Sequence, residues 1–377
     1  MALFRLAKAS LLSALIIGAA CSSSSNSNST DAGSGGSKGT GGSGGTGTGG
    51  TAGGDGGTTV DAPVDMASTD TVNADTANTD TANTDGGDGG TLTADQMRGQ
   101  YLTGLLGCVN CHTPKLTGGA LDTANLFGGV DCTADASGNC LSTPNLTPDT
   151  TGIKTWTDQQ VIDAFRLGKD PEVPADGGAA GYLFMNMPYY QFANLTDDDA
   201  KAIVAYLRQL KPIAHEVKDN AGTYATQPTA PQWSPADPAA LPAPGTGAPA
   251  DAATGKYLAT LMCVTCHTLN TAATAPLHVD ETKAFQGGKT SSITGDGGTM
   301  MFQSANLTPD ATGVKDWTAM DLVTAIRMAK DKMGKTLCSP MRANATITVA
   351  DATAIADYLL SLPAVANPAV NACMTRM

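Results

Sequence analysis

The 377-residue sequence is short of histidine, of basic residues and, after residue 20, of long apolar runs. Four histidines make the search for metal ligands a short one. Lys and Arg number 22 against 35 Asp and Glu, a formal net charge of −13, which argues against nucleic acid as a partner. The lack of a long apolar run predicts that nothing beyond residue 20 crosses a bilayer.

Residues 1–21 predict an export signal. Basic residues precede an apolar run over residues 9–20, which is too short for a membrane span and is typical of a cleaved leader. The small residues before Cys21 resemble a bacterial lipobox, although the leucine usual in that motif is missing. We expect lipidation of Cys21 and an outer-membrane lipoprotein facing the periplasm or the cell surface, anchored through lipid alone. The alternative is that cleavage falls nearby and removes Cys21.

Residues 22–91 consist mainly of Ser, Gly, Thr, Asn and Asp, with a five-residue acidic repeat. Such a segment has almost nothing apolar to bury, so we expect a disordered tether rather than a binding element. Part of the negative charge belongs to this region. The chain from residue 92 onward has 26 acidic and 19 basic residues, which leaves −7 and is compatible with a basic patch on a redox partner.

One five-residue string occurs twice, with the pattern C-x-x-C-H. Its residues are Cys108, Cys111 and His112, and then Cys263, Cys266 and His267. In an exported protein this pattern is the haem c attachment site, because each cysteine can form a thioether to a haem vinyl group while the histidine ligates iron. The sequence therefore predicts two haem c groups. A structural zinc site needs four ligands at each string and would leave the rest of the repeat unexplained.

The repetition extends far beyond the two strings. Asn-Leu-Thr-Pro-Asp at 145–149 returns at 306–310, and the segment 195–207 resembles 347–359. This duplication predicts two tandem domains, at residues 92–218 and 251–377. Residues 219–250 between them are rich in Pro and Ala and predict a semi-extended linker, which Trp233 could pin to one domain.

Helix signals recur in each predicted domain. Thr93 with Gln96 and Thr157 with Gln160 are capping boxes, and Gly168 is a helix stop. Apolar residues at helical spacing give the last helix of each domain one buried face. These residues are Ile203, Tyr206, Leu207 and Leu210, and Ile355, Tyr358, Leu359 and Leu362. Strand alternation is not convincing anywhere, so the predicted fold class is all-α.

Methionine is the expected second iron ligand, because the other two histidines, His215 and His278, stand at unlike positions. Met187 follows His112 by 75 residues and Met341 follows His267 by 74. A thioether opposite imidazole favours ferrous iron and leaves no open coordination position.

The cysteines and the other methionines keep alternatives open. Met185 and Met333 are the competing ligands, and a Cys338 thiolate is a third for the second iron. Two cysteine pairs fit disulfides in an oxidising compartment: Cys132–Cys140 and Cys338–Cys373.

The Asn-Leu-Thr-Pro-Asp, Thr-Gly and Trp-Thr strings and the Met-Pro-Tyr before the last helix resemble class I c-type cytochromes. Among these, the sequence is similar to cytochrome subunits that accept electrons from periplasmic alcohol and sugar dehydrogenases. The resemblance covers about residues 92–215 and 251–363. It departs in having two haem strings, where those dehydrogenase subunits often have three, and in having Pro-Met-Arg in place of Met-Pro-Tyr in the second unit.

The resemblance implies roles for further residues. Trp156 and Trp317 would contact haem propionates, with plain core packing as the alternative. Arg166 and Arg327 would also contact haem propionates, with a solvent-exposed helix face as the alternative. Gly99 with Tyr101 would let the first helix cross the last one near Tyr206.

These features together predict an electron carrier with two haem c groups and redox partner proteins as donor and acceptor. No residue needs to act as acid, base or nucleophile. The alternatives are a dihaem oxidoreductase such as a peroxidase, a cytochrome subunit of a dehydrogenase complex, and a surface-tethered module whose haems are structural.

Overall fold

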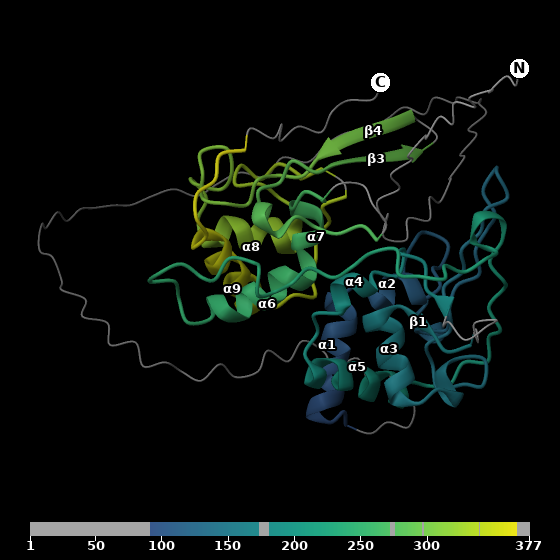
Figure 1. Cartoon of the computed structure of the whole chain (residues 1–377). Helices are drawn as coiled ribbons and strands as arrows, with labels where there is room; N and C mark the ends of the chain where they lie inside the picture. Colours follow the sequence, from purple (N-terminus) through teal and green to yellow (C-terminus); the bar gives the residue numbers. More distant parts are fainter. Residues whose placement is uncertain (1–90, 173–180, 272–275, 296–297, 339, 368–377) are drawn as a thin grey trace, which may run out of the picture. The chain divides into compact units, whose positions relative to one another are not determined.

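A computed structural model describes residues 91–172, 181–271, 276–295, 298–338 and 340–367 (Figure 1). The predicted export signal, Cys21, the predicted tether up to residue 90, and Cys373 lie outside the described residues.

The described chain is mostly helical, and its elements follow in two similar series. The first series is α1 (Ala94–Leu105), α2 (Cys108–His112), α3 (Asp158–Leu167), α4 (Tyr189–Phe192) and α5 (Asp197–Gln209). The second is α6 (Ala252–Met262), α7 (Val264–His267), α8 (Ala319–Met328) and α9 (Val349–Leu360). Short 3-10 helices are η1 (Thr123–Asn125), η2 (Ile153–Thr155), η3 (Gly222–Tyr224) and η4 (Glu281–Lys283).

The predicted helix caps are confirmed. Thr93 and Gln96 form a reciprocal capping box at α1, and Thr157 and Gln160 form another at α3. Gly168 ends α3 in the left-handed conformation, with φ 70°. These local signals act through single side chains, which is why they could be identified without knowledge of the tertiary structure.

Helix α1 packs against α5, and α6 packs against α9, so each series has its own crossed pair. A Cβ atom at Gly99 would overlap the carbonyl of Ala202 and crowd Tyr206, which confirms the predicted crossing point. Gly255 meets the carbonyl of Ala354 in the same way. Only glycine allows two helix backbones to approach this closely.

Both series have the same aromatic contact on the last helix. Phe127 meets Tyr206 edge-on with ring centroids 6.1 Å apart, and Phe285 meets Tyr358 at 5.7 Å. Both phenylalanines have positive φ, 60° and 61°, an uncommon conformation for a bulky residue. The repeat therefore extends to backbone conformation, and the predicted apolar faces of α5 and α9 are buried as expected.

The all-α expectation omits two small antiparallel sheets. Strands β1 (Lys169–Asp170) and β2 (Gly181–Tyr182) pair, and β3 (Thr290–Gly295) pairs with β4 (Gly298–Gln303). The longer hairpin, β3–β4, is formed by the Gly-rich segment that distinguishes the second repeat from the first. Its main-chain pairing follows no clear alternation of apolar residues, so the pattern that identifies strands was missing.

The Pro/Ala-rich linker packs on the helices through Trp233, which is 2 % exposed. Its ring stacks on Tyr190 of the first series at 4.7 Å between centroids, and its backbone bridges Leu277 of the second. The expectation that Trp233 pins the linker to one series was too narrow, because it contacts both.

Two tyrosines join the series reciprocally. Tyr101 on α1 donates a hydrogen bond to Asp351 on α9 and accepts one from the backbone of Thr348. Its counterpart Tyr257 on α6 donates to Asp199 on α5, at 2.7 Å, and accepts from the backbone N–H of Thr196. The resemblance led us to expect Tyr101 at the helix crossing of its own series, but its hydroxyl instead lies at the N-terminus of the other series' last helix. We call these contacts the tyrosine clasps.

The clasps shift the ionisation of their members. Burial, and then the hydrogen bond to Asp351, raises the pKa of Tyr101 to about 12. Burial and the hydrogen bond to Asp199 likewise raise the pKa of Tyr257 to about 12. Burial alone would raise the pKa of Asp199, but hydrogen bonds from Arg98 and Tyr257 outweigh it and lower the pKa.

The clasps predict a loss of stability at alkaline pH. A tyrosine ionises near pH 10 in an unfolded chain. The clasps should therefore make their full contribution to the free energy of unfolding below about pH 10, and this contribution should be lost as pH rises towards 12. We expect Tyr101→Phe with Tyr257→Phe to lower stability at neutral pH and to make its alkaline decline shallower. Denaturant unfolding across this pH range measures both.

Tyr224→Phe is the matched control, because this tyrosine takes no part in either clasp. It should leave the alkaline decline as steep as in the unaltered protein. An equally steep decline in the double variant would contradict the assigned role of the clasps.

Candidate haem-binding sites

The first C-x-x-C-H string forms a single helical turn directly after α1. Gly107, with φ 79°, separates the two helices, and α2 begins at Cys108. The second string forms α7 after α6, with Cys263 at the junction. Burial raises the pKa of the Cys108 and Cys263 thiols to about 12 each. In the absence of a thioether bond, both thiols are therefore protonated at neutral pH.

The imidazole of His112 is buried and oriented by the backbone. Its Nδ1 lies 2.9 Å from the carbonyl oxygen of Pro144. Because a carbonyl only accepts hydrogen bonds, Nδ1 carries the proton and Nε2 carries the lone pair. Nε2 has no hydrogen-bond partner among the described residues, and burial lowers the pKa of His112, which favours this neutral form.

His267 has the same arrangement in the second series. Its Nδ1 lies 2.8 Å from the carbonyl oxygen of Ala305, and burial lowers its pKa as well. Pro144 and Ala305 each directly precede the repeated Asn-Leu-Thr-Pro-Asp string. A hydrogen bond that fixes the tautomer of a metal-binding histidine is a usual feature of such sites.

Further contacts around the two strings match one by one. The carbonyls of His112 and His267 accept from Gly129 and Gly287, at 3.0 and 2.8 Å. Threonines directly after the histidines, Thr113 and Thr268, accept from the backbone N–H of Phe127 and Phe285. Two neighbouring cysteines and a histidine whose free nitrogen is Nε2 form the donor set that haem c requires, so the residues of both strings fit this group.

Asn145 explains why Asn-Leu-Thr-Pro-Asp has this composition. Its side-chain oxygen accepts hydrogen bonds from the N–H and the hydroxyl of Thr147, and its Nδ2 donates to Thr151 and to the Ile213 carbonyl, at 2.7 Å. A Cβ atom at Gly152 would press on the Asn145 and Thr147 carbonyls. The string thus forms a closed polar loop that holds the Pro144 carbonyl against His112.

Asn306 repeats this network at the second site. It accepts from Thr308 twice and donates to Thr312 and to the Val365 carbonyl, at 3.0 and 2.8 Å. Asn145 and Asn306 are both buried, at 2 % and 1 % exposure. Each is fully hydrogen-bonded, which makes the loop a rigid support for the histidine.

The predicted methionines differ in environment. Met187 and its competitor Met185 are both partly buried against the core, and the backbone N–H of Met185 donates to Gln232 of the linker. Met341 is 36 % exposed, whereas its competitor Met333 is 83 % exposed, which favours Met341. Iron ligation by Met187 and Met341 stays a prediction.

The two remaining histidines have other partners. His215 lies 2.8 Å from the Gly128 carbonyl, and His278 lies 2.7 Å from both Ser234 and Glu281. Each histidine thus has protein partners of its own, and the exclusion of both from the haem sites stays a prediction.

The arginines predicted near the haem contact the start of the last helix in each series. Arg166 pairs with Asp197 at 2.7 Å, and Arg327 donates to the Ile347 carbonyl. The indole of Trp156 donates to Glu172, while Trp317 is half-buried against the core. Contact of any of these residues with a propionate remains a prediction.

Sequence reasoning missed Arg208, at the end of α5. Its guanidinium donates to the carbonyls of Ile153 and Trp156 and pairs with Asp158, so it fixes the segment that carries the tryptophan. The second repeat has Leu360 at the matching position. Because the arginine is not repeated, comparison of the two repeats could not identify it as a structural residue.

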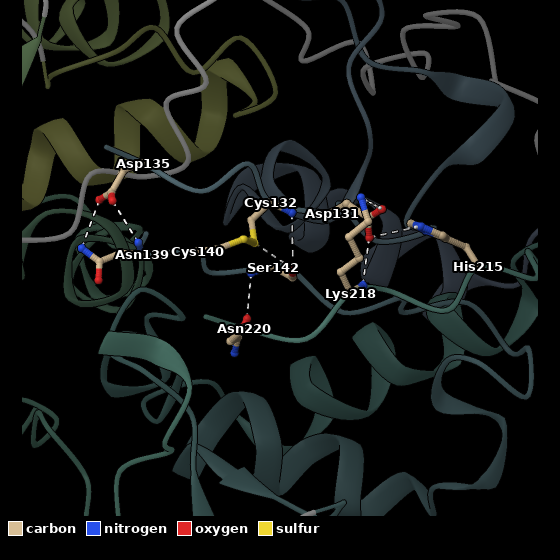
Figure 2. The surroundings of a disulfide bond; sticks show 9 residues. All are labelled: Asp131, Cys132, Asp135, Asn139, Cys140, Ser142, His215, Lys218 and Asn220. Atoms are coloured by element: carbon tan, nitrogen blue, oxygen red, sulfur yellow. Dashed lines mark hydrogen bonds and ion pairs between the residues drawn. A yellow bond between two sulfur atoms is a disulfide. The ribbon is translucent and has the colours of Figure 1, made fainter. Parts of the chain in front are cut away.

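A disulfide joins Cys132 to Cys140, with Cα atoms 5.5 Å apart (Figure 2). Ser142 beside it donates to the sulfur of Cys132 and accepts from its backbone, and Asn220 accepts from the backbone of Ser142. The disulfide thus closes a short loop within the segment between His112 and Pro144. Cys338 is also disulfide-bonded, and a disulfide sulfur offers iron no thiolate; its predicted partner Cys373 lies outside the described residues.

Comparison with known proteins agrees with this geometry. The cytochrome c family model matches residues 96–211, which therefore form a cytochrome c domain. Over 184 residues the chain is 33 % identical to the cytochrome c subunit of a quinone-dependent alcohol dehydrogenase from Komagataeibacter europaeus, covering 45 % of this chain and 35 % of that protein.

Two further relatives have similar descriptions. The chain is 36 % identical over 118 residues to the fructose dehydrogenase cytochrome subunit of Gluconobacter japonicus, covering 31 % of this chain and 21 % of that subunit. It is 36 % identical over 125 residues to the gluconate 2-dehydrogenase cytochrome c subunit of Pantoea cypripedii, covering 33 % and 25 %. The chain thus spans about a third or less of the length of these relatives.

The polar loops give a prediction about stability. Asn145→Ala leaves buried donors and acceptors without partners, so it should lower the free energy of unfolding by roughly 1–3 kcal/mol. Asn306→Ala should do the same in the second series. Denaturant unfolding followed by helical circular dichroism measures the change.

Asn110→Ala provides the control, because this asparagine is exposed on α2. Its effect should stay within about 0.5 kcal/mol. Equal stability of Asn145→Ala and Asn110→Ala would show that the loop is not the support described above.

Proposed function

We propose that the chain is an electron carrier that binds two haem c groups, one at each C-x-x-C-H string. The observation that supports this most directly is the duplicated histidine geometry, with Nδ1 bonded to a carbonyl and Nε2 free at both His112 and His267. The similarity to cytochrome c subunits points to the same function for residues 96–211.

Different side chains of each site would form different bonds to the haem. Cys108 with Cys111, and Cys263 with Cys266, would supply thioether bonds, while the histidines would ligate iron through Nε2. Met187 and Met341 would complete the coordination. Bound haem supplies a one-electron ferric–ferrous couple. With these ligands in place, the protein would need no acid, base or nucleophile, and its own residues would retain the group, bury it and tune it electrostatically.

We propose that residues 251–377 form a second cytochrome c domain, joined to the first, residues 92–218, by the linker 219–250. The support is the matched series of helices, the matched glycine crossings and the matched asparagine loops. A duplicated unit predicts one haem in each half.

The proposed location is the periplasmic side or the cell surface, with lipid on Cys21 as the anchor and residues 22–91 as the tether. Among the described residues, no helix has the length and apolar character to span a bilayer. The Cys132–Cys140 disulfide supports an oxidising compartment.

The proposed partners are redox proteins, and the relatives favour a periplasmic dehydrogenase as electron donor. The chain would then act as the cytochrome subunit of such a complex. A peroxidase is the less favoured candidate, because it needs an open or displaceable iron ligand and both halves contain a methionine at matching spacing.

Substitution of the methionines tests the proposal. A redox titration followed by optical spectra should show two low-spin haems, each with a methionine-to-iron charge-transfer band. Met187→Ala should remove this band from one haem and lower its reduction potential, and Met341→Ala should do the same for the other. Loss of the thioether destabilises ferrous iron, which sets the direction of the shift.

Met185→Ala and Met333→Ala are the matched controls, since they remove the competing methionines. Both should leave the two spectra unchanged. A five-coordinate high-spin haem in the unaltered, half-reduced protein, together with turnover of peroxide, would favour the peroxidase instead.

A further inference from the structure

The two halves differ in charge at one matched position close to the haem strings. Counting from the matched Phe127 and Phe285, the residue four places on is Asp131 in the first half and Lys289 in the second. The two backbones match as far as Gly129 and Gly287, which make the same bond to the histidine carbonyl. The next residue differs, since Gly288 with φ 84° stands where the first half has Val130. An acidic side chain in one half is therefore replaced by a basic one in the other.

Asp131 is partly exposed and is compensated by basic neighbours. Its carboxylate lies 3.3 Å from Nζ of Lys218 and 3.6 Å from Nε2 of His215, and it accepts from the Lys218 backbone at 2.9 Å (Figure 2). The backbone hydrogen bond from Lys218 is the main factor that lowers the pKa of Asp131. Its negative charge is thus screened by solvent and by these partners.

Lys289 is in the opposite situation. It is 5 % exposed, and its Nζ donates to the Thr265 carbonyl at 2.7 Å and to the side-chain oxygen of Asn270 at 3.0 Å. Nζ also lies 4.8 Å from the ring centroid of Trp233, a cation–π contact. Among the described residues, no carboxylate lies within ion-pair distance of it. Lys289 is therefore a buried cation whose neighbours are neutral.

A buried cation of this kind is costly, because desolvation is offset here only by dipoles and an aromatic ring. Burial lowers the pKa of Lys289 to about 8, which still leaves the ammonium charged at neutral pH. An apolar side chain of similar length would fill the same volume without that cost. Packing alone therefore does not account for a charged side chain at this position.

Lys289 lies next to the second haem string. Thr265, which accepts its hydrogen bond, stands between Cys263 and Cys266 in the second haem string. Trp233, on the other side of the ammonium, stacks on Tyr190, three residues after Met187 of the first half. The cation thus lies against the second haem string, at the junction between the two halves.

A fixed positive charge beside a redox group favours its reduced, less positive state, and the interaction is strong where the dielectric constant is low. We propose that Lys289 raises the reduction potential of the second haem site above that of the first, so that electrons pass from the first half to the second. This inference rests on the proposed function. One electron leaves the reduced first site and reduces the oxidised second site, and no bond or proton changes place.

Removal of the charge tests the proposal. In a spectroscopic redox titration of the full chain at neutral pH, Lys289→Met should lower the potential of the second site and leave that of the first unchanged. The second site is recognised as the one whose band is lost in Met341→Ala. Lys289→Gln, which is also neutral but keeps a hydrogen-bond donor, should cause the same shift, whereas Lys289→Arg should keep the potential close to that of the unaltered protein.

Lys283→Met is the matched control, because this lysine is half-exposed and pairs with Asp280 at 3.0 Å. It should move neither potential. Haem counts and thermal unfolding of every variant show whether the fold and both groups are retained. Two bound haems with potentials unmoved by both neutral variants would overturn the role of Lys289, and so would a first site with the higher potential. Absence of haem from the unaltered protein would instead overturn the proposed function.

Discussion

The hydrogen bond from a histidine Nδ1 to a backbone carbonyl is the interaction on which the rest of each site depends. It commits Nε2 of His112 and His267 to act as a lone-pair donor, and desolvation lowers the pKa of both rings, which favours the neutral form. The Asn-Leu-Thr-Pro-Asp loops hold those carbonyls in place through asparagines that are fully hydrogen-bonded. The most distinctive repeated string of the sequence thus acts through a neighbouring main-chain oxygen.

The duplication also shapes the relation between the halves. Each first helix crosses its own last helix at a glycine and extends a tyrosine to the last helix of the other half. The same sequence feature thereby organises packing within a half and contact between halves. The halves also differ in charge and in linker contact, as Lys289 and Trp233 show.

Much of the fold could be predicted because its signals are local or repeated. Capping boxes at Thr93 and Thr157, and the apolar faces of the last helices, depend on residues close in sequence. The β3–β4 hairpin could not be predicted, since its pairing is main-chain and its strands do not alternate clearly. The reach of Tyr101 to Asp351 depends on how two halves pack together. Arg208 has no counterpart in the second half, so alignment of the repeats could not reveal it.

Mass spectrometry of the protease-digested, exported protein can show whether both C-x-x-C-H strings bind haem covalently. We expect the peptide containing Cys108 and Cys111 and the peptide containing Cys263 and Cys266 each to carry one covalently attached haem, so that the intact chain carries two. A haem on only one of these peptides, or free thiols or zinc at both strings, would contradict this expectation.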